Sequence, residues 1–478
     1  MKKSFLLLLL SFAPTATLAQ PPLTLAAVIE AAQRHSVSAQ QATTARETAA
    51  LSWRRTRADF RPQVSVVGTL PDFSRAITPV VQPDGTTDFR AVRLNNSSLQ
   101  LAATQNLGFT GGQFTVATGV QRFDDFNGGK RLYNAQPLAV GLTQPLRGFN
   151  VLAWARRTEP LRYEEAVRQL PQDRETLAQR ATEAFFDVLL QQQQAELAAQ
   201  NERTATELLW LGREKLALGR LAQADVLLLE LNQIRAEQAR QQAELATQTA
   251  TLALHTLAGL PPDGSLPLAV PPPAPAPVVV PAAAVAEARA RRPEAFGFRR
   301  RLLEADRDVA RARFTGGPQA TLTANLGYIN RAESFTASYI SLQNQQRVRL
   351  AFAVPLLDWG RQRATVRLAE AARELARRTV AQDSVTLAET VRTLVVQLPT
   401  LHTQVRLTAR ADSLARRRYA ITQEVYKVGR LSLTDLGIAQ TEKDAARRAY
   451  VEALRAAWMA HFRLRALTLF DWVRGEGV

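Results

Sequence analysis

The chain has 478 residues, carries a formal net charge of +17 and contains no cysteine. The missing cysteine excludes disulfides, thiolate catalysis and thiolate metal sites. Hydrophobic residues make up 46% of the sequence while aromatic residues make up only 7%, and this balance is suited to long helices that pack along their length.

The first residues have the order of a secretory signal peptide. Two lysines precede an apolar run at Phe5–Leu10, and the small residues Thr17 and Ala19 have the spacing of a cleavage site. The run is too short to cross a bilayer, which takes about 20 apolar residues. We predict a signal peptide over residues 1–19 and a mature chain that starts at Gln20. No later stretch is apolar and long enough for a transmembrane helix, so any membrane span is predicted to be β.

The positive charge does not indicate a nucleic-acid partner. The arginines are spread through helical segments and are not gathered into one patch with aromatic residues. A solvated helix face, or a surface that faces anionic lipid, explains the charge better. We therefore expect outer-membrane lipid, and no nucleic acid, among the partners.

The first half of the mature chain, residues 20–260, predicts a helix, a β region and a long helical hairpin. The β region, at about 62–145, shows residues that alternate between apolar and small or polar. The hairpin, at 150–258, shows a seven-residue ladder that indicates helices packed with knobs in holes. The same alternation suits an outer-membrane barrel and a soluble sandwich, so period alone does not separate them. The alternating residues are Val64, Val66, Leu99, Leu101, Phe114, Val116, Val120, Leu138, Val140 and Leu142, and the ladder residues are Leu231, Leu245 and Leu252.

A proline-rich stretch at 261–281 separates the two halves and is predicted to be an extended linker. The second half, residues 282–472, predicts a helix, a β-hairpin at about 318–355 and another long helical hairpin at 361–470. The same order of predicted elements therefore occurs twice in the chain.

Two pairs of motifs show that the chain is internally duplicated. Gly-Arg-Leu occurs at Gly219 and Gly429, and Pro-Leu occurs at Pro145 and Pro355. Both offsets are 210 residues (429 − 219 and 355 − 145). An upstream Pro-Gln pair at Pro62 and Pro318 shows that the first β region is 46 residues longer than the second (83 − 37). This excess predicts extra strands near the turn Phe109–Phe114.

The stretch from Pro145 to Gly219 spans roughly 110 Å if it is helical, with kinks expected at Pro171 and Pro399. One protomer supplies too few strands to close a barrel, which takes about eight. The strands must therefore be shared between copies of the chain in a closed symmetric oligomer.

This pattern resembles the TolC family of outer-membrane efflux proteins. The resemblance covers nearly all of the mature chain and includes the duplicated halves, both Gly-Arg-Leu turns and the stretch Arg291–Phe296. It implies a mainly α protomer with β-strands, whose long antiparallel helical hairpins form a periplasmic α-barrel. It also implies a homotrimer in which transmembrane strands complete one shared barrel in the outer membrane of a Gram-negative bacterium. A periplasmic adaptor protein and an inner-membrane transporter are the implied partners.

The resemblance also implies roles for particular residues. The hairpin turns become periplasmic tips that contact the adaptor. A pore constriction is implied at Asp435, with Asp225 linked to Tyr426 as a second element of the gate. Three copies of Asp435 around a threefold axis should repel one another and have raised pKa values. The tip residues are Gly219, Arg220, Leu221, Gly429, Arg430 and Leu431, and the transitions from strand to helix are Pro145, Leu146, Pro355 and Leu356.

The implied function is a channel-tunnel of a tripartite efflux or type I secretion system, passing small toxic compounds or proteins. No enzyme is expected, because the four histidines are isolated, no nucleotide or hydrolase motif is present and no cofactor is indicated. The alternative is a secreted or surface structural coiled-coil protein without transport activity. The sequence does not name the cargo, the adaptor or the pump.

Overall fold

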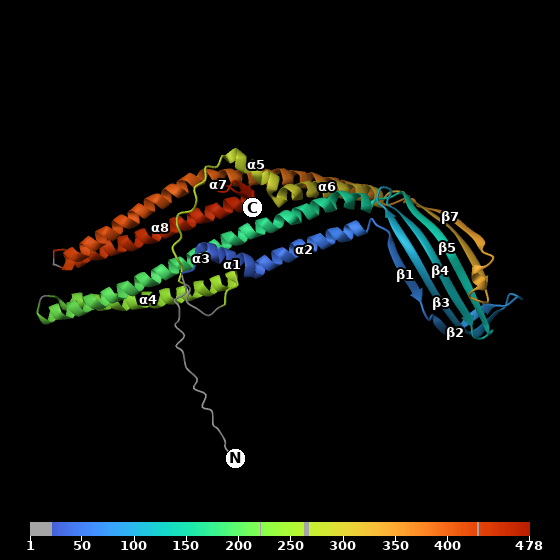
Figure 1. The fold of residues 1–478 in the computed structure, drawn as a ribbon, viewed down its shortest axis with the longest axis horizontal. Coiled ribbons are helices and arrows are strands. Elements are labelled where there is room, and N and C mark those ends of the chain that lie inside the picture. Colours follow the sequence, from blue (N-terminus) through green and yellow to red (C-terminus); the bar gives the residue numbers. More distant parts are fainter. Residues whose placement is uncertain (1–21, 220, 262–266, 428–429) are drawn as a thin grey trace, which may run out of the picture.

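The structure is a computed structural model that describes residues 22–219, 221–261, 267–427 and 430–478. The signal-peptide prediction, Arg220 and Gly429 lie outside the described residues. Long helices fill one end of an elongated protomer and a single curved sheet fills the other (Figure 1). No helix in the described part of the chain has the length and apolarity needed to cross a membrane.

The two halves of the chain contain helices of matching length. α3 and α7 have 67 residues each, and α4 and α8 have 36 each. Each pair starts 210 residues apart (361 − 151 and 433 − 223), which is the offset of the sequence motifs. The helices are α1 Leu25–His35, α2 Val37–Ala58, α3 Val151–Ala217, α4 Gln223–Ala258, α5 Pro281–Arg291, α6 Pro293–Thr315, α7 Arg361–Lys427 and α8 Leu433–Thr468.

Local capping explains where several helices begin. The side chains of Thr24, Ser36 and Asn150 accept hydrogen bonds from the first turns of α1, α2 and α3, which satisfies backbone donors that have no partner within the helix. α5 and α6 begin at prolines instead, whose fixed φ suits the first helical position. α3 continues through Pro160 and Pro171 without a break in its assignment.

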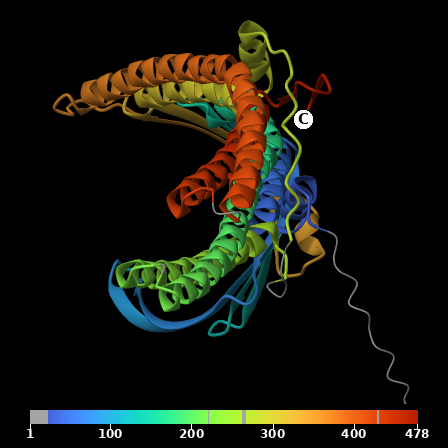
Figure 2. The ribbon, with the colours of Figure 1, turned by 90° about the vertical axis from the view of Figure 1, so that its left-hand side faces the viewer.

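The long helices form one curved layer. Toward the hairpin ends, α4 packs on α3, α3 on α8, and α8 on α7; toward the sheet, the order is α2, α3, α6 and α7 (Figure 2). The largest apolar cluster lies midway along α3, where α1, α4 and α8 converge around Phe185, Phe186 and Leu454. A second cluster joins α5, α7 and α8 around Val391 and Leu464. The layer is therefore four helices wide along its length.

The sheet is antiparallel, with the order β1-β3-β4-β5-β6-β7. β2 pairs with the outer part of β3 while β1 pairs with its inner part, so β1 and β2 lie end to end along one neighbour. The sheet is thus six strands wide; we refer to these six positions as lanes. The strands are β1 Gln63–Thr69, β2 Phe73–Val81, β3 Thr87–Leu107, β4 Gly112–Asp125, β5 Lys130–Arg147, β6 Gln319–Ala332 and β7 Gln343–Ala353, with a small C-terminal pair β8 Phe470–Asp471 and β9 Glu476–Gly477.

The 46-residue excess in the first half contributes two lanes of this sheet. The four alternating segments expected there are β1, β3, β4 and β5, and β2 is a fifth strand that the alternation did not predict. The turn between β3 and β4 lies where the sheet meets the helices. Gln105 donates from Nε2 to the carbonyl of Phe60 at 2.9 Å, and Asn150 donates from Nδ2 to the carbonyl of Gly108 at 3.2 Å. The β3–β4 hairpin is therefore fixed to the end of α2 and the start of α3.

The linker crosses from one half of the layer to the other as an extended strap (Figure 1). It is held at its first described residues by the amide of Leu23, which donates to the carbonyl of Pro267 at 2.8 Å. Further along, the indole nitrogen of Trp458 donates to the carbonyl of Pro272 at 2.9 Å. The strap thereby ties α1 of the first half to α8 of the second.

Candidate channel site

One face of the sheet is apolar in all six lanes. The register aligns Val66 with Leu101 and Val116 with Val140, and Leu326 lies beside Val140 on the same face. The most exposed large apolar side chains of this face are between 39% and 76% exposed in the protomer: Val64, Val66, Leu99, Leu101, Phe114, Leu138, Leu326, Tyr328, Val348, Leu350 and Phe352. A continuous apolar surface of this extent indicates contact with lipid or another apolar surface.

The apolar face ends at a polar cluster toward the far end of β4. On this strand the outward apolar residues run from Phe114 to Val120, about 20 Å at the rise of a strand. Two residues further, Arg122 pairs with Asp124 at 2.9 Å, and Arg131 of β5 pairs with the same carboxylate at 2.8 Å. The change from apolar to ion-paired side chains marks one boundary of the apolar band.

Both edges of the protomer present unpartnered elements. β1 with β2 forms one edge of the sheet and β7 the other. Below them, α4 and α7 form the edges of the helical layer, and each carries exposed leucines at seven-residue spacing, such as Leu245 on α4 and Leu414 on α7. Heptad spacing on an exposed face indicates a helix that packs along a partner. The edge residues in question are Leu231, Leu245 and Leu252 on α4, and Leu407, Leu414 and Ile421 on α7.

The first hairpin tip turns at Gly219, whose φ of +65° is in the left-handed region that favours glycine. A Cβ built there has no neighbour within 4 Å, so the backbone angle alone favours glycine. Leu221 follows and is partly buried beside Leu209 of α3. In the second tip, Arg430 and Leu431 are exposed. The described residues of both tips are thus available for contact at the end of the molecule.

Asp435 caps α8. Its carboxylate accepts hydrogen bonds from the amide and the hydroxyl of Ser432, at 3.2 and 2.6 Å, while the Ser432 hydroxyl accepts from the amide of Asp435 at 3.1 Å. This reciprocal arrangement is a capping box. The Ser432 hydroxyl and backbone lower the pKa of Asp435 in the protomer. The raised pKa predicted for a ring of three carboxylates requires neighbouring copies and remains a prediction.

The other gate residues lie apart in this protomer. Asp225 is exposed in the first turn of α4, and Tyr426 lies near the end of α7. Among the described residues no hydrogen bond joins the two, and the starts of α4 and α8 are separated in both views (Figures 1 and 2). Their link therefore stays a prediction.

The Pro-Leu motifs lie at the joint between sheet and helices. Pro145 is still paired with Thr321 in β5, and Leu146 lies in the same strand, four residues before the cap of α3. Pro355 and Leu356 follow the end of β7, and α7 starts at Arg361. Both motifs occupy the last residues before the chain turns into a long helix.

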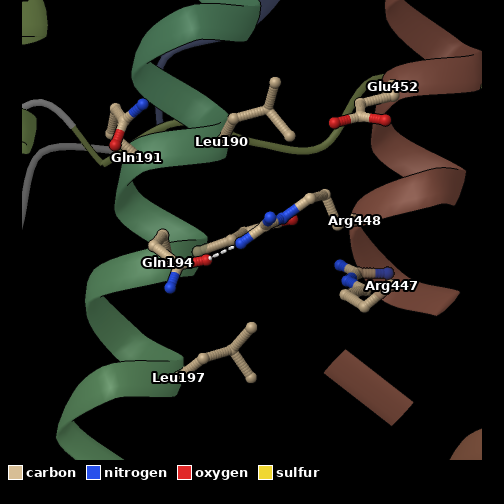
Figure 3. Close-up of a pocket in the computed structure, with 8 residues that line it drawn as sticks. Leu190, Gln191, Gln194, Leu197, Arg447, Arg448 and Glu452 are labelled. Carbon is tan, nitrogen blue, oxygen red and sulfur yellow. Dashed lines mark hydrogen bonds between the residues drawn. The ribbon is translucent and has the colours of Figure 1, made fainter. Parts of the chain in front are cut away.

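The contact between α3 and α8, which joins the two repeats, combines the apolar cluster around Phe185 and Leu454 with polar pairs along its length. Figure 3 shows a pocket in it, where Arg448 donates a hydrogen bond to Gln194. Higher along the same contact, Arg455 pairs with Asp187 at 2.8 Å.

Nothing in the described residues assembles a catalytic or metal centre. No three His, Asp or Glu side chains there lie close enough to hold a metal ion. His461, whose pKa is lowered to about 4 chiefly by burial, lies edge to face with the rings of Trp458 and Phe462. Burial of a neutral imidazole in an aromatic cluster explains this histidine.

The fold is that of the TolC-like outer-membrane channels, which confirms the predicted fold class of a mainly α protomer with β-strands. The CmeC outer membrane channel of Campylobacter jejuni aligns with a TM-score of 0.65 at 15% identity, over 93% of this chain and 85% of that one. CusC aligns at 0.63 and 16%, over 93% and 91%. The open state of the MtrE outer membrane channel of Neisseria gonorrhoeae aligns at 0.62 and 15%, over 93% and 88%. No sequence matches in a search of curated proteins.

Residues 284–468 match the family described as outer membrane efflux protein. The matched stretch runs from α5 to the end of α8 and so covers the second repeat. The predicted resemblance to outer-membrane efflux proteins is thereby confirmed over the second repeat. The family is one of channels rather than enzymes.

Proposed function

We propose that three copies of this chain form a channel-tunnel that carries compounds from a periplasmic adaptor and an inner-membrane pump across the outer membrane. The observation that carries the proposal is that the protomer is an arc with two open edges. One face of its sheet is apolar, and both edges of its helical layer carry exposed leucines. An arc of this kind buries its edges only by closing on further copies.

In this arrangement β7 of one copy pairs with β1 and β2 of the next. β1 leaves the helices and β7 returns to them, so the two edges run antiparallel when one copy follows another around an axis. Six lanes in each of three copies give a shared barrel of eighteen lanes. Barrels of 16–18 strands leave an aqueous channel. The helical edges meet in the same way, α4 against α7 of the next copy.

At the far end, the two hairpin tips of each copy contact the adaptor, and Asp435 narrows the pore. Gly219, Leu221, Arg430 and Leu431 are the described tip residues that would meet the adaptor, and the predicted contacts Arg220 and Gly429 lie outside the described residues. The Asp225–Tyr426 pair links the tips in the closed state. The cargo is chosen by the pump, so small toxic compounds and secreted proteins both remain compatible with this tunnel.

Two measurements test the proposal. The purified oligomer is weighed by native mass spectrometry in detergent and its conductance is recorded in planar lipid bilayers. Three copies with discrete conductance steps support the channel. A soluble rod that forms no conductance overturns it and favours a structural coiled-coil protein. Sensitivity of a deletion strain to toxic compounds, compared with loss of a secreted protein, separates efflux from secretion.

A further inference from the structure

In the rows that back the apolar band, the polar face of the sheet has charge in one lane. In the three rows that back the apolar band, the register of β3 to β7 brings uncharged residues together with two arginines of β7. One row reads Thr104, Thr115, Gly141, Asn325 and Arg347; the next reads Asn106, Gln113, Thr143, Thr323 and Arg349; the third reads Ala102, Ala117, Ala139, Gly327 and Gln345. β1 adds Gln63 and Ser65 to this face. Within these rows of the described sheet, Arg347 and Arg349 are the only charged residues.

Both arginines are exposed, and neither has a salt bridge to a described residue. Their strand neighbours Val348 and Leu350 are 71% and 57% exposed on the opposite, apolar face. Because side chains alternate along a strand, the two guanidinium groups project from the polar face at the height of the apolar band. They are therefore not part of an ionic boundary like the one at Asp124.

The side chains that neighbour Arg347 and Arg349 on the polar face are short or lie flat against the sheet. Gly141 lies in the row of Arg347, and a Cβ there would meet Oδ1 of Asn325 at 2.8 Å, so the asparagine side chain lies over the glycine. In the third row, Gln136 donates from Nε2 to Oε1 of Gln345 at 3.1 Å, across the intervening lane that holds Gly327. Within these three rows, the neighbouring side chains are short or are amides that lie flat, so the two long arginine side chains project furthest from the sheet.

The edge that would adjoin β7 brings no compensating charge. β1 contains Gln63, Ser65, Val67 and Thr69 on the polar face, and its whole sequence QVSVVGT lacks an acidic residue. Closure of the sheet on further copies would thus bring uncharged residues to Arg347 and Arg349. An unpaired guanidinium in a partly enclosed aqueous lumen creates a positive potential that neighbouring acids do not cancel.

We propose that Arg347 and Arg349 of three copies form a ring of six guanidinium groups in the barrel lumen that favours anionic solutes, bearing carboxylate or phosphate groups, over cations. The inference rests on the proposed function, since it needs the polar face to line a shared lumen. Charged side-chain rings of this kind set selectivity in pores, and arginine suits anions because its planar fork matches carboxylate and phosphate oxygens. The ring lies at the opposite end of the molecule from Asp435, so the tunnel carries opposite charges at its two ends.

The chain has no cysteine, so a single introduced thiol reports the local potential without background. Thr143→Cys places the reporter on the polar face two lanes from Arg349, about 10 Å away. The purified oligomer is reacted with negatively charged sulfonatoethyl methanethiosulfonate and with positively charged trimethylammonioethyl methanethiosulfonate. The ratio of the two rates is measured in the reporter alone, with Arg349→Gln, and with Arg410→Gln as a matched control far along α7.

We expect Arg349→Gln to lower the ratio of anionic to cationic rates about fourfold at low salt, as a unit charge about 10 Å away in water changes each rate about twofold. Adding Arg347→Gln lowers it further, and Arg410→Gln leaves it unchanged. A reporter that reacts with both reagents at a ratio insensitive to Arg349→Gln overturns the ring. A reporter that reacts with neither, while Leu350→Cys reacts with both, also overturns it, because the faces are then reversed.

Conductance of the same preparations keeps this test apart from that of the proposed function. If the oligomer conducts but the ratio of labelling rates is unchanged by Arg349→Gln, the channel is supported and the proposed arginine ring is overturned. An oligomer that does not conduct removes the channel itself, whatever the ratio of labelling rates.

Discussion

Nη2 of Arg465 lies 2.9 Å from Oε1 of Glu175, a carboxylate whose side chain is only 3% exposed. The pair joins α8 of the second repeat to α3 of the first. Burial raises the pKa of Glu175, and the nearby positive charge of Arg465 acts against this shift. A raised pKa in the folded state means that the stability contributed by this carboxyl is full below its ordinary pKa of about 4.5 and is lost as the pH rises through the folded pKa.

Arg465→Met should therefore destabilise the protein in a pH-dependent way. Without its cation the buried carboxylate costs about 3 kcal/mol at pH 7, and its pKa rises further. Lowering the pH to 5 should recover part of the loss, because the carboxyl takes up a proton. Thermal unfolding of the variant at both pH values checks this. The control, Glu175→Gln with Arg465→Met, should be more stable than the single variant at pH 7 and less sensitive to pH; equal losses at both pH values would contradict the explanation.

Asp435 takes part in the capping box of α8, and we propose that it also supplies a pore charge. Asp435→Asn removes the charge, whereas Ser432→Ala weakens the same capping box by about 1 kcal/mol and keeps the carboxylate. We expect single-channel conductance or cation preference to change in Asp435→Asn and not in Ser432→Ala. The same change in both variants would assign the effect to the cap.

The pH dependence of that selectivity distinguishes the isolated protomer from the ring. Hydrogen bonds from Ser432 lower the pKa of Asp435, so a carboxylate governed by its cap stays charged to lower pH than an ordinary aspartate, and cation preference should persist to correspondingly lower pH. Repulsion among three carboxylates acts in the opposite direction and would abolish the preference at higher pH. Reversal potentials between pH 7 and 3.5 measure which effect is larger.

Gly219→Ala should loosen the first tip without unfolding the molecule. The left-handed backbone costs a residue with a Cβ about 1 kcal/mol, while Asn tolerates it better. Hydrogen exchange at the start of α4 should rise in Gly219→Ala, rise less in Gly219→Asn, and stay unchanged at Phe185 in the core. No increase at α4 would show that the tip is held by contacts rather than by its backbone angle.

Leu414→Glu should break the oligomer and spare the protomer. Leu414 is 56% exposed on the edge of α7, so a charge there costs little until α7 meets another helix. Native mass spectrometry should show loss of the trimer with unchanged helical circular dichroism. Arg299→Glu, an exposed change on α6 away from both edges of the layer, should leave the trimer intact; a trimer that survives Leu414→Glu would place the contact between copies elsewhere.

Sequence reasoning predicted the helices well because their signals are local. The 210-residue offset fixed two helical hairpins, and Gly219 marked a reversal that its backbone angle explains. β2 was missed because Pro79 interrupts its pattern, and a proline-containing strand is tolerated only at an edge, where β2 lies. The capping box at Ser432 was also missed, although the Ser-x-x-Asp spacing could have indicated it.

To predict the polar face with its two arginines, the pairing register between strands is needed as well as the alternation within each strand. Alternation around Val348 and Leu350 already separates Arg347 and Arg349 from the apolar residues. Whether acids in other strands face them depends on pairings such as Asn325 with Arg347, which connect residues far apart in the chain. Single-strand patterns do not contain that information.

The sheet is six strands wide and the helical layer is four helices wide, and this has a further consequence where they join, near Pro145 and Pro355. Six strands about 4.8 Å apart, tilted by about 40°, extend about 37 Å around a circumference. Four helices about 9–10 Å apart extend about 36–40 Å. The extra hairpin between Leu107 and Gly112 thus equalises the two perimeters. With four lanes the sheet would reach only about 25 Å, and the wall of the proposed oligomer would have to taper like a funnel. With six lanes that wall would continue as a tube of constant bore.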